Sequence, residues 1–479
     1  MIAYHYLLIS SALDCASKAP SSSINMAQGR LSDAQTSAMA ASELANGSIF
    51  EVARIKQVCG DIHLLRGALE DAEESYRSSL KSLGTSPEAE ALSCRAAGLL
   101  ALFQKRFETA ASCFQKIVKA SCGLPLRVEA HIFLAQIFFE AGLRTKAQEL
   151  LTSALNETRL ACHYGWQHFI SLVLYDFDVR IVVQNQIELR DDIYWQSLGQ
   201  GVPQRSAPSL DPIDGPYDAS VARLIRQRAD ELGHMLSLAR GYASDSMALQ
   251  SSLGNTRLLS LQCHQTLVLE LTQAALAGKL VHIAEILIVG AAPVALQRNL
   301  SSADGTDPQQ RQLLHCYAKL RLLQGLTDEG LALYANYALL AMQAMRNVYP
   351  ITQLFDDKPQ SHYAVVKDDI SARLPARYRR AYQYMLAHAH LPSLSINDVA
   401  NVIGVSERAL QLAFKEHIGL TPREVLRRFR MQKIREDLQE ATGAGVMEVA
   451  MKHGIKNRTA LTAGYRRYYN ETPSKTTMS

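Results

Sequence analysis

Two glycines placed 50 residues apart near the end of this 479-residue chain constrain the local fold more than any other feature. Gly404 follows a short apolar helical face and precedes Ser406, a residue type that caps helices, and Gly454 repeats the turn. Each glycine therefore predicts a tight turn between two short helices. Residues from Arg423 to Glu440 predict one long basic helix that joins them. The sequence thus predicts two linked helix-turn-helix units.

The net charge of the chain changes sign at the start of the same region. From Arg373 onward, 18 lysines and arginines stand against 9 aspartates and glutamates, whereas the preceding residues hold 32 against 37. The last hundred residues therefore carry +9 and the remainder −5. Such an excess indicates a module that binds a polyanion, with double-stranded DNA as the expected partner.

The second helix of each unit has an apolar face and a polar face. The predicted inward residues are Leu410, Ala413, Phe414 and Ile418 in the first unit, and Leu461, Tyr465, Tyr468 and Tyr469 in the second. The first unit offers Arg408 and Gln411 outward, and their forked side chains fit the edges of guanine and adenine. A solvated helix face would explain these residues in isolation, but the pattern occurs twice.

The last hundred residues resemble the DNA-binding domain of the AraC/XylS family of bacterial transcription regulators. The resemblance is carried by "GIKNRTALTAGYRRYYNETP" and by "SERALQLAFKEHIGLTP" in the first unit. It implies two recognition helices in successive major grooves about 34 Å apart, so that one chain reads a direct repeat. The implied base-reading positions are Arg408, Gln411 and Leu412 in the first unit, and Arg458, Thr459, Thr462 and Ala463 in the second. The implied phosphate contacts are Lys415, Arg466 and Arg467.

The sequence departs from this family at several positions. Leu412 and Ala463 stand where the family often has arginine, so each helix would lack a usual guanine reader and rely on contact with thymine methyl groups or on neighbouring residues. Ile455 and Leu461 replace phenylalanines. Gly464 costs a helix about 1 kcal/mol relative to alanine, and we expect it to lie near the wall of the DNA groove.

A second repeat, at a spacing of 38 and then 37 residues, occupies the first 200 residues. It predicts three helical hairpins, each with a small residue, a turn residue, a second small residue and a large apolar residue. The three sets are Gly60, Gly67, Ala72 and Tyr76; Gly98, Lys105, Ala110 and Phe114; and Ala135, Gly142, Ala147 and Leu151. This pattern resembles the tetratricopeptide repeat, in which small residues let two helices approach closely. A generic helical bundle is the alternative, and Ala318, Gly325, Gly330 and Tyr334 suggest a further copy.

Proline-rich stretches divide the chain, and strand patterns are lacking before residue 370. We therefore expect an all-α protein in five segments. These are a repeat domain at 1–200, a Pro-rich loop at 201–216, a further helical region at 217–348, a linker at 349–376 and an AraC-type domain at 377–479.

A long, repeat-containing region ahead of an AraC-type domain resembles the layout of the HrpB/HrpX group, the activators of type III secretion genes in plant-pathogenic bacteria. The resemblance implies an activator that recruits RNA polymerase and controls secretion and effector genes. The inner face of the repeats would offer a groove for a regulatory protein, a peptide or a second copy of the chain.

Other functional classes find little support. The sequence has no phosphate-binding loop, no dinucleotide fingerprint, no nucleophile elbow and no zinc-protease motif, so we expect neither an enzyme nor a cofactor. Cys162, His163 and His168 have the wrong spacing for a metal site on one helical face, and we expect the cysteines to pack as small buried residues.

No apolar run approaches the roughly 20 residues of a membrane span, so we expect a cytoplasmic protein. A helical-repeat scaffold with a non-specific nucleic-acid-binding tail is the remaining alternative.

Overall fold

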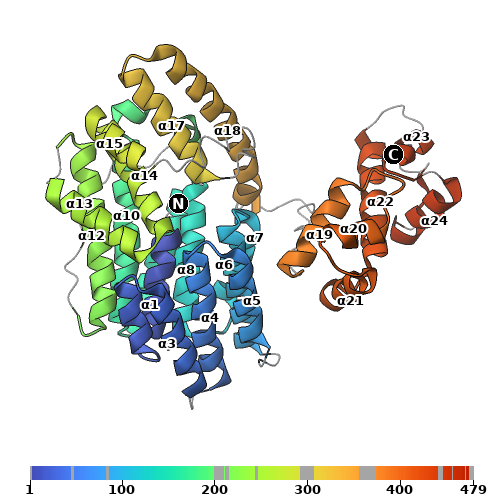
Figure 1. Cartoon of the computed structure of the whole chain (residues 1–479), viewed down its shortest axis with the longest axis horizontal. Helices are drawn as coiled ribbons and strands as arrows, with labels where there is room; N and C mark the ends of the chain where they lie inside the picture. Colours follow the sequence, from blue (N-terminus) through green and yellow to red (C-terminus); the bar gives the residue numbers. More distant parts are fainter. Residues whose placement is uncertain are drawn as a thin grey trace. The chain divides into compact units, whose positions relative to one another are not determined.

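The protein is described by a computed structural model, and every regular element among the residues that it describes is helical. The described residues are 3–44, 48–81, 83, 86–198, 210, 215–242, 246–291, 307–354, 374–440, 446–455, 457–469 and 471–473. The chain divides into two compact units, Met1–Ala364 and Val365–Ser479, whose helices are labelled in Figure 1. The predicted loop at 201–216 and linker at 349–376 fall largely outside the described residues, and the predicted domain boundaries stay predictions.

The N-terminal unit is built mainly from antiparallel helix pairs (Figure 1). Its first helices are α1 (Ala3–Cys15), α2 (Pro20–Ala27), α3 (Leu31–Leu44), α4 (Ile49–Leu65), α5 (Leu69–Leu80), α6 (Pro87–Phe103), α7 (Phe107–Lys119), α8 (Leu124–Glu140) and α9 (Arg144–Leu160). The unit continues with α10 (Tyr164–Gln184), the 3-10 turn η1 (Ile187–Leu189), α11 (Ile193–Leu198), α12 (Ala219–Ala239), α13 (Ser246–Leu259), α14 (Leu261–Ala277), α15 (Val281–Ala291), α17 (Pro308–Leu323) and α18 (Thr327–Leu354). Helix α18 thus extends past the predicted end of the helical region at residue 348. None of the described helices combines the length and apolarity needed to cross a bilayer.

Three of the hairpins turn at the residues that the repeat pattern assigns. Gly67, Lys105 and Gly142 have φ of 78°, 63° and 79°. This left-handed region suits glycine, which has no Cβ to collide with the backbone. At Lys105 the same conformation costs about 1 kcal/mol, because a side chain is present.

The small residues of the repeat lie where paired helices approach most closely. A Cβ added to Gly60 would lie 2.5 Å from the ring of Tyr76, and one added to Gly98 would lie 3.0 Å from the ring of Phe114. Ala135, at the same position of the third hairpin, is fully buried. The predicted register therefore describes the packing of α4 to α9. The assignment to the tetratricopeptide type stays a prediction.

Helix α1 lies inside the N-terminal unit, in contact with α2, α4, α8, α10, α12 and α14. All its residues except Leu13 are buried. A helix surrounded in this way must be predominantly apolar around its whole circumference, as α1 is. The inner face for which the sequence predicted a partner groove is thus occupied by the chain's own first helix. A partner in such a groove stays a prediction.

A buried ionic network joins α1 to the inner helices α4, α6 and α8. Arg95 of α6 donates to both oxygens of Asp61, at 2.9 and 2.8 Å, and to both oxygens of Glu129, at 2.6 and 2.7 Å. Asp14 of α1 pairs with Arg54, which also donates to Glu129 at 2.8 Å. Two arginines and three carboxylates are thereby held together in the buried interior of the unit.

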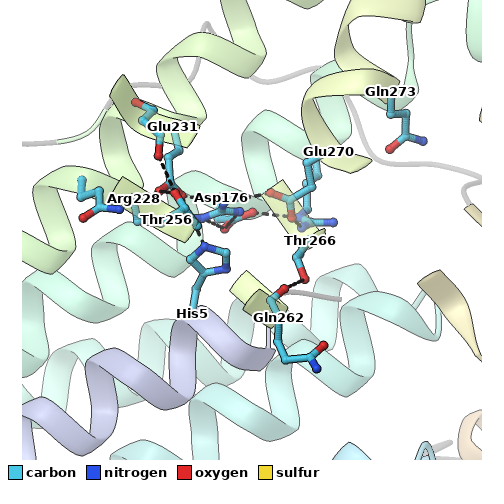
Figure 2. A network of polar contacts seen from close by, with 12 residues as sticks. His5, Asp176, Arg228, Glu231, Thr256, Gln262, Thr266, Glu270 and Gln273 are labelled. Carbon is cyan, nitrogen blue, oxygen red and sulfur yellow. Dashed lines mark hydrogen bonds and ion pairs between the residues drawn. The ribbon is translucent and has the colours of Figure 1, made fainter. Parts of the chain in front are cut away.

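A second network of the same composition lies at the other end of α1 (Figure 2). Arg228 donates to Asp176 and to Glu270, both at 2.9 Å. The Nε2 atom of His5 stands 3.5 Å from the carboxylate of Glu231. Burial, followed by the positive charge of Arg228, lowers the pKa of His5 to about 3. The two arginines and three carboxylates of this network are Arg180, Arg228, Asp176, Glu231 and Glu270.

The prediction that the cysteines are buried was wrong for Cys162. Cys162 and His163 lie in the turn between α9 and α10 and are exposed, because Cys162 takes a left-handed φ of 56° that directs the chain around the turn. The prediction holds for Cys15, Cys59, Cys263 and Cys316, which are buried, whereas Cys94, Cys113 and Cys122 are only partly buried.

Candidate nucleic-acid interface

The C-terminal unit contains two helix-turn-helix modules that share one long helix. Its helices are α19 (Ala376–Ala387), α20 (Ile396–Val402), α21 (Glu407–Ile418), α22 (Pro422–Glu440), α23 (Val446–Lys452) and α24 (Arg458–Tyr469). Helices α19, α20 and α21 form one apolar core with the beginning of α22, and α23 and α24 form another with its remainder. The long basic helix predicted from Arg423 to Glu440 is α22.

The first module has the caps and the turn that the sequence predicts. The Ser395 hydroxyl accepts the N–H of Asp398 at 3.1 Å, and the Asp398 carboxylate accepts the N–H of Ser395 at 3.0 Å. Gly404 turns the chain with φ of 62°, and Ser406 accepts the N–H of Ala409 at 3.2 Å. These bonds satisfy helix-end donors that would otherwise lack partners.

Helix α21 buries one side and exposes the predicted base-reading side. Arg408 and Lys415 are exposed, and Leu412 is 67% exposed. Gln411 is half-buried and donates from Nε2 to Glu407 at 2.9 Å. Because residues three, four and seven apart share a helix face, Arg408, Gln411, Leu412 and Lys415 lie on one side. The opposite side packs into the core through Leu410, Ala413 and Phe414.

Helix α24 has a comparable exposed side. Arg458, Thr459, Ala463 and Arg466 are exposed, whereas Thr462 is half-buried and donates from its hydroxyl to the Arg458 carbonyl at 3.0 Å. The hydroxyl of Thr462 therefore remains available as an acceptor. Arg467 lies at the edge of this side, its Nη2 atom 3.9 Å from Glu424 of α22. The buried residues of α24 are Leu461, Gly464 and Tyr465.

The predicted position of Gly464 was wrong. Gly464 is buried, and a Cβ added there would lie 2.8 Å from Cε and 3.1 Å from Sδ of Met431 on α22. The missing side chain therefore lets α24 pack closely on α22 and has no relation to the wall of a DNA groove.

Comparisons with known proteins agree with this architecture. A family profile described as "Helix-turn-helix domain" matches residues 399–478. Regulatory protein HrpB of Ralstonia nicotianae is 29% identical over 429 residues, which cover 87% of each chain. Together with the two helix-turn-helix modules, these matches support an AraC-type regulator of transcription that is similar to HrpB. A probable thc operon regulatory protein of Rhodococcus erythropolis is 38% identical over 104 residues, covering 21% of this chain and 31% of that protein. The C-terminal domain of AraT from Geobacillus stearothermophilus is 24% identical over 22% of this chain and 87% of that one, with a TM-score of 0.21.

Two polar contacts of the AraC-type domain escaped sequence reasoning. Arg377 of α19 donates from Nε to the Ile403 carbonyl at 3.0 Å and from Nη2 to the Gly404 carbonyl at 2.7 Å, which fixes the first turn. Asn457 accepts the N–H of Thr459 at 2.8 Å and so caps α24. Asparagine is a favoured cap residue, so the second contact had a signal in the sequence. The first had none, because it links residues that are far apart along the chain.

Proposed function

We propose that this chain activates transcription by binding a direct repeat of two short promoter boxes, one per helix-turn-helix module. The observation that carries the proposal is the presence of two recognition-type helices, α21 and α24. Each helix buries one side in its own apolar core and leaves the opposite side exposed. Both cores share α22, so a single chain presents two helices for successive major grooves.

The exposed side chains suggest how each box is read. Arg408 and Arg458 have the fork that matches O6 and N7 of guanine, and Gln411 matches N6 and N7 of adenine. Gln411 must give up or share its bond to Glu407 to do so. Leu412 and Ala463 offer methyl groups to thymine, and Thr459 and Thr462 add hydroxyl contacts. Phosphates are proposed to contact Lys415, Arg466 and Arg467.

The proposed targets are type III secretion and effector genes, with RNA polymerase as the partner at their promoters in the bacterial cytoplasm. Support comes from the similarity to Regulatory protein HrpB, which extends through the N-terminal unit as well as the DNA-binding domain. Similarity confined to the last hundred residues would indicate DNA binding without favouring a regulon.

A footprint tests the proposal directly. Binding sites are first selected from random duplexes with the full-length chain, and a selected site is then probed for protection. We expect two protected boxes on one face of the DNA, one helical turn apart, and a steep loss of affinity with salt. Equal binding of selected and scrambled duplexes at physiological salt would instead favour a scaffold with a non-specific nucleic-acid-binding tail.

Two arginine substitutions on α24 are expected to behave differently. Arg458→Ala should weaken binding to the selected site by about 1 to 3 kcal/mol and relax the base preference at one position. Arg467→Ala should weaken binding to all duplexes alike and lower the salt slope by about 1. Titrations on selected and single-base-changed duplexes at several salt concentrations measure both effects. The opposite assignment of effects would show that α24 presents a different side to the bases.

A further inference from the structure

Three segments of the C-terminal unit meet at Arg430, near the middle of α22. The guanidinium donates from Nε to the carbonyl of Ala389 at 2.8 Å and from Nη2 to the carbonyl of Leu391 at 2.7 Å. Both carbonyls belong to the segment that follows α19 in the first module. The turn of the second module approaches the same place, because a Cβ on Gly454 would lie 3.0 Å from the His390 carbonyl and 3.1 Å from Nη2 of Arg430.

The two modules share no apolar core at this junction. Phe429 packs with the first cluster and Met431 belongs to the second, and the clusters have no member in common among the residues described. Arg430 stands between them. Apolar packing therefore holds each module on its own half of α22, whereas Arg430 donates hydrogen bonds to the first module and stands against the turn of the second.

Arginine is well suited to this junction. Its planar fork directs two N–H groups at two carbonyls at once, which fixes direction as well as distance. Its positive charge faces the carboxyl end of α19, where the helix dipole is negative. Gly454 allows the approach, since it is buried, has φ of 75° and leaves no side chain between the modules.

We propose that Arg430 is a positioning residue that fixes the relative orientation of the two recognition helices and thereby the spacing of the two DNA boxes that the chain accepts. This inference rests on the proposed function. When the second module is held in one orientation, it meets its box at a high effective concentration once the first module is bound, and the second box adds strongly to the affinity. A loosely held module gains less affinity from the second box but tolerates other spacings between the boxes.

The DNA test uses the full-length chain and duplexes built from a selected site. The duplexes carry both boxes at the selected spacing, both boxes with one or two base pairs inserted or deleted, or one box alone. Arg430→Ala is expected to bind one-box DNA as the parent chain does and to lose at least about tenfold in affinity for the selected two-box site. Its discrimination among spacings should shrink, and Arg430→Lys should fall between the two. Equal losses on one-box and two-box DNA, or unchanged discrimination, would overturn the proposal.

Arg427→Ala is the matched control, because Arg427 is an exposed arginine one turn away on the same helix. The Arg427→Ala substitution should weaken binding to one-box and two-box DNA alike.

A measurement without DNA tests the positioning role independently of the proposed function. It records the distribution of distances between two spin labels, carried by non-natural amino acids at positions Glu416 and Ala460. The distribution should be narrow in the parent chain and broad in Arg430→Ala. An unchanged distribution would overturn the positioning role even if direct-repeat binding is established, and a parent chain indifferent to the second box would refute the proposed function first.

Discussion

Replacing Arg95 with methionine is expected to lower the free energy of unfolding of the N-terminal unit by about 3 to 5 kcal/mol. Arg95 bonds two carboxylates at once, and neither the guanidinium nor Asp61 nor Glu129 is more than 1% exposed. Methionine keeps the length and apolar packing of the side chain but leaves the carboxylates facing each other. They must then repel in a medium of low dielectric or take up protons, and either outcome costs stability.

Urea denaturation followed by tryptophan fluorescence measures this effect. The chain has two tryptophans, and both Trp166 and Trp195 are buried in the N-terminal unit, so the signal reports on that unit alone. Arg127→Met is the matched control. Arg127 donates to Glu157 at 2.8 and 3.0 Å, but the two side chains are 29% and 34% exposed, and the loss should stay below about 1 kcal/mol. Equal losses in the two variants would show that the buried network contributes no more than a surface pair.

The hairpin register was predictable because close contacts between helices admit only small side chains. Glycine and alanine therefore recur at a regular spacing in the sequence. Two further hairpins were missed although they keep the same spacing, with small residues seven before and five after the turn. In α2–α3 and α14–α15 these positions are held by Ser22, Gly29 and Ala34, and by Thr272, Lys279 and Ala284, all buried except the two turn residues. Serine and threonine replace glycine there, so a search for glycine and alanine alone passes over them.

The buried networks could not be predicted from one sequence. Asp61 and Arg95 each stand as a single charge within an apolar stretch of an inner helix, and Glu129 follows Arg127 in an otherwise largely apolar helix, which is a signal of burial with a partner. Which charge meets which depends on how successive hairpins stack. The insertion of α1 between them is a tertiary arrangement without a local pattern.

The candidate interface was predictable where the period of the helix alone determines which side chains are buried and which are exposed. The inward positions Leu410, Phe414, Leu461 and Tyr465 are buried as predicted, and the exposed sides follow from the period of the helix. Gly464 was misplaced because its environment is set by the crossing of α24 and α22. The base-reading and phosphate-contacting roles remain predictions.

Acid is expected to weaken the N-terminal unit through His5. The pKa of His5 is lowered from 6.5 to about 3, so the unfolded chain takes up a proton near pH 6.5 that the folded chain refuses until about pH 3. The stability that neutral His5 contributes is therefore complete above pH 6.5. It is lost as the pH falls, by up to ~1.4 kcal/mol per pH unit. The charged groups around His5 are Arg228 and Glu231 of α12, Glu270 of α14 and Arg180 of α10.

The substitution His5→Gln separates this titration from the others. Burial raises the pKa of Asp14 to about 6 and opposes the loss between pH 6 and 4, but Asp14 titrates in both chains and largely cancels in their difference. By pH 4 the parent chain should have lost roughly 3 kcal/mol more than His5→Gln, relative to pH 7. Denaturation midpoints from pH 7 to 4 measure this divergence, and the exposed His163→Gln should run parallel to the parent chain. Parallel curves for His5→Gln as well would mean that the folded chain accepts the proton, with His5 charged against the carboxylate of Glu231.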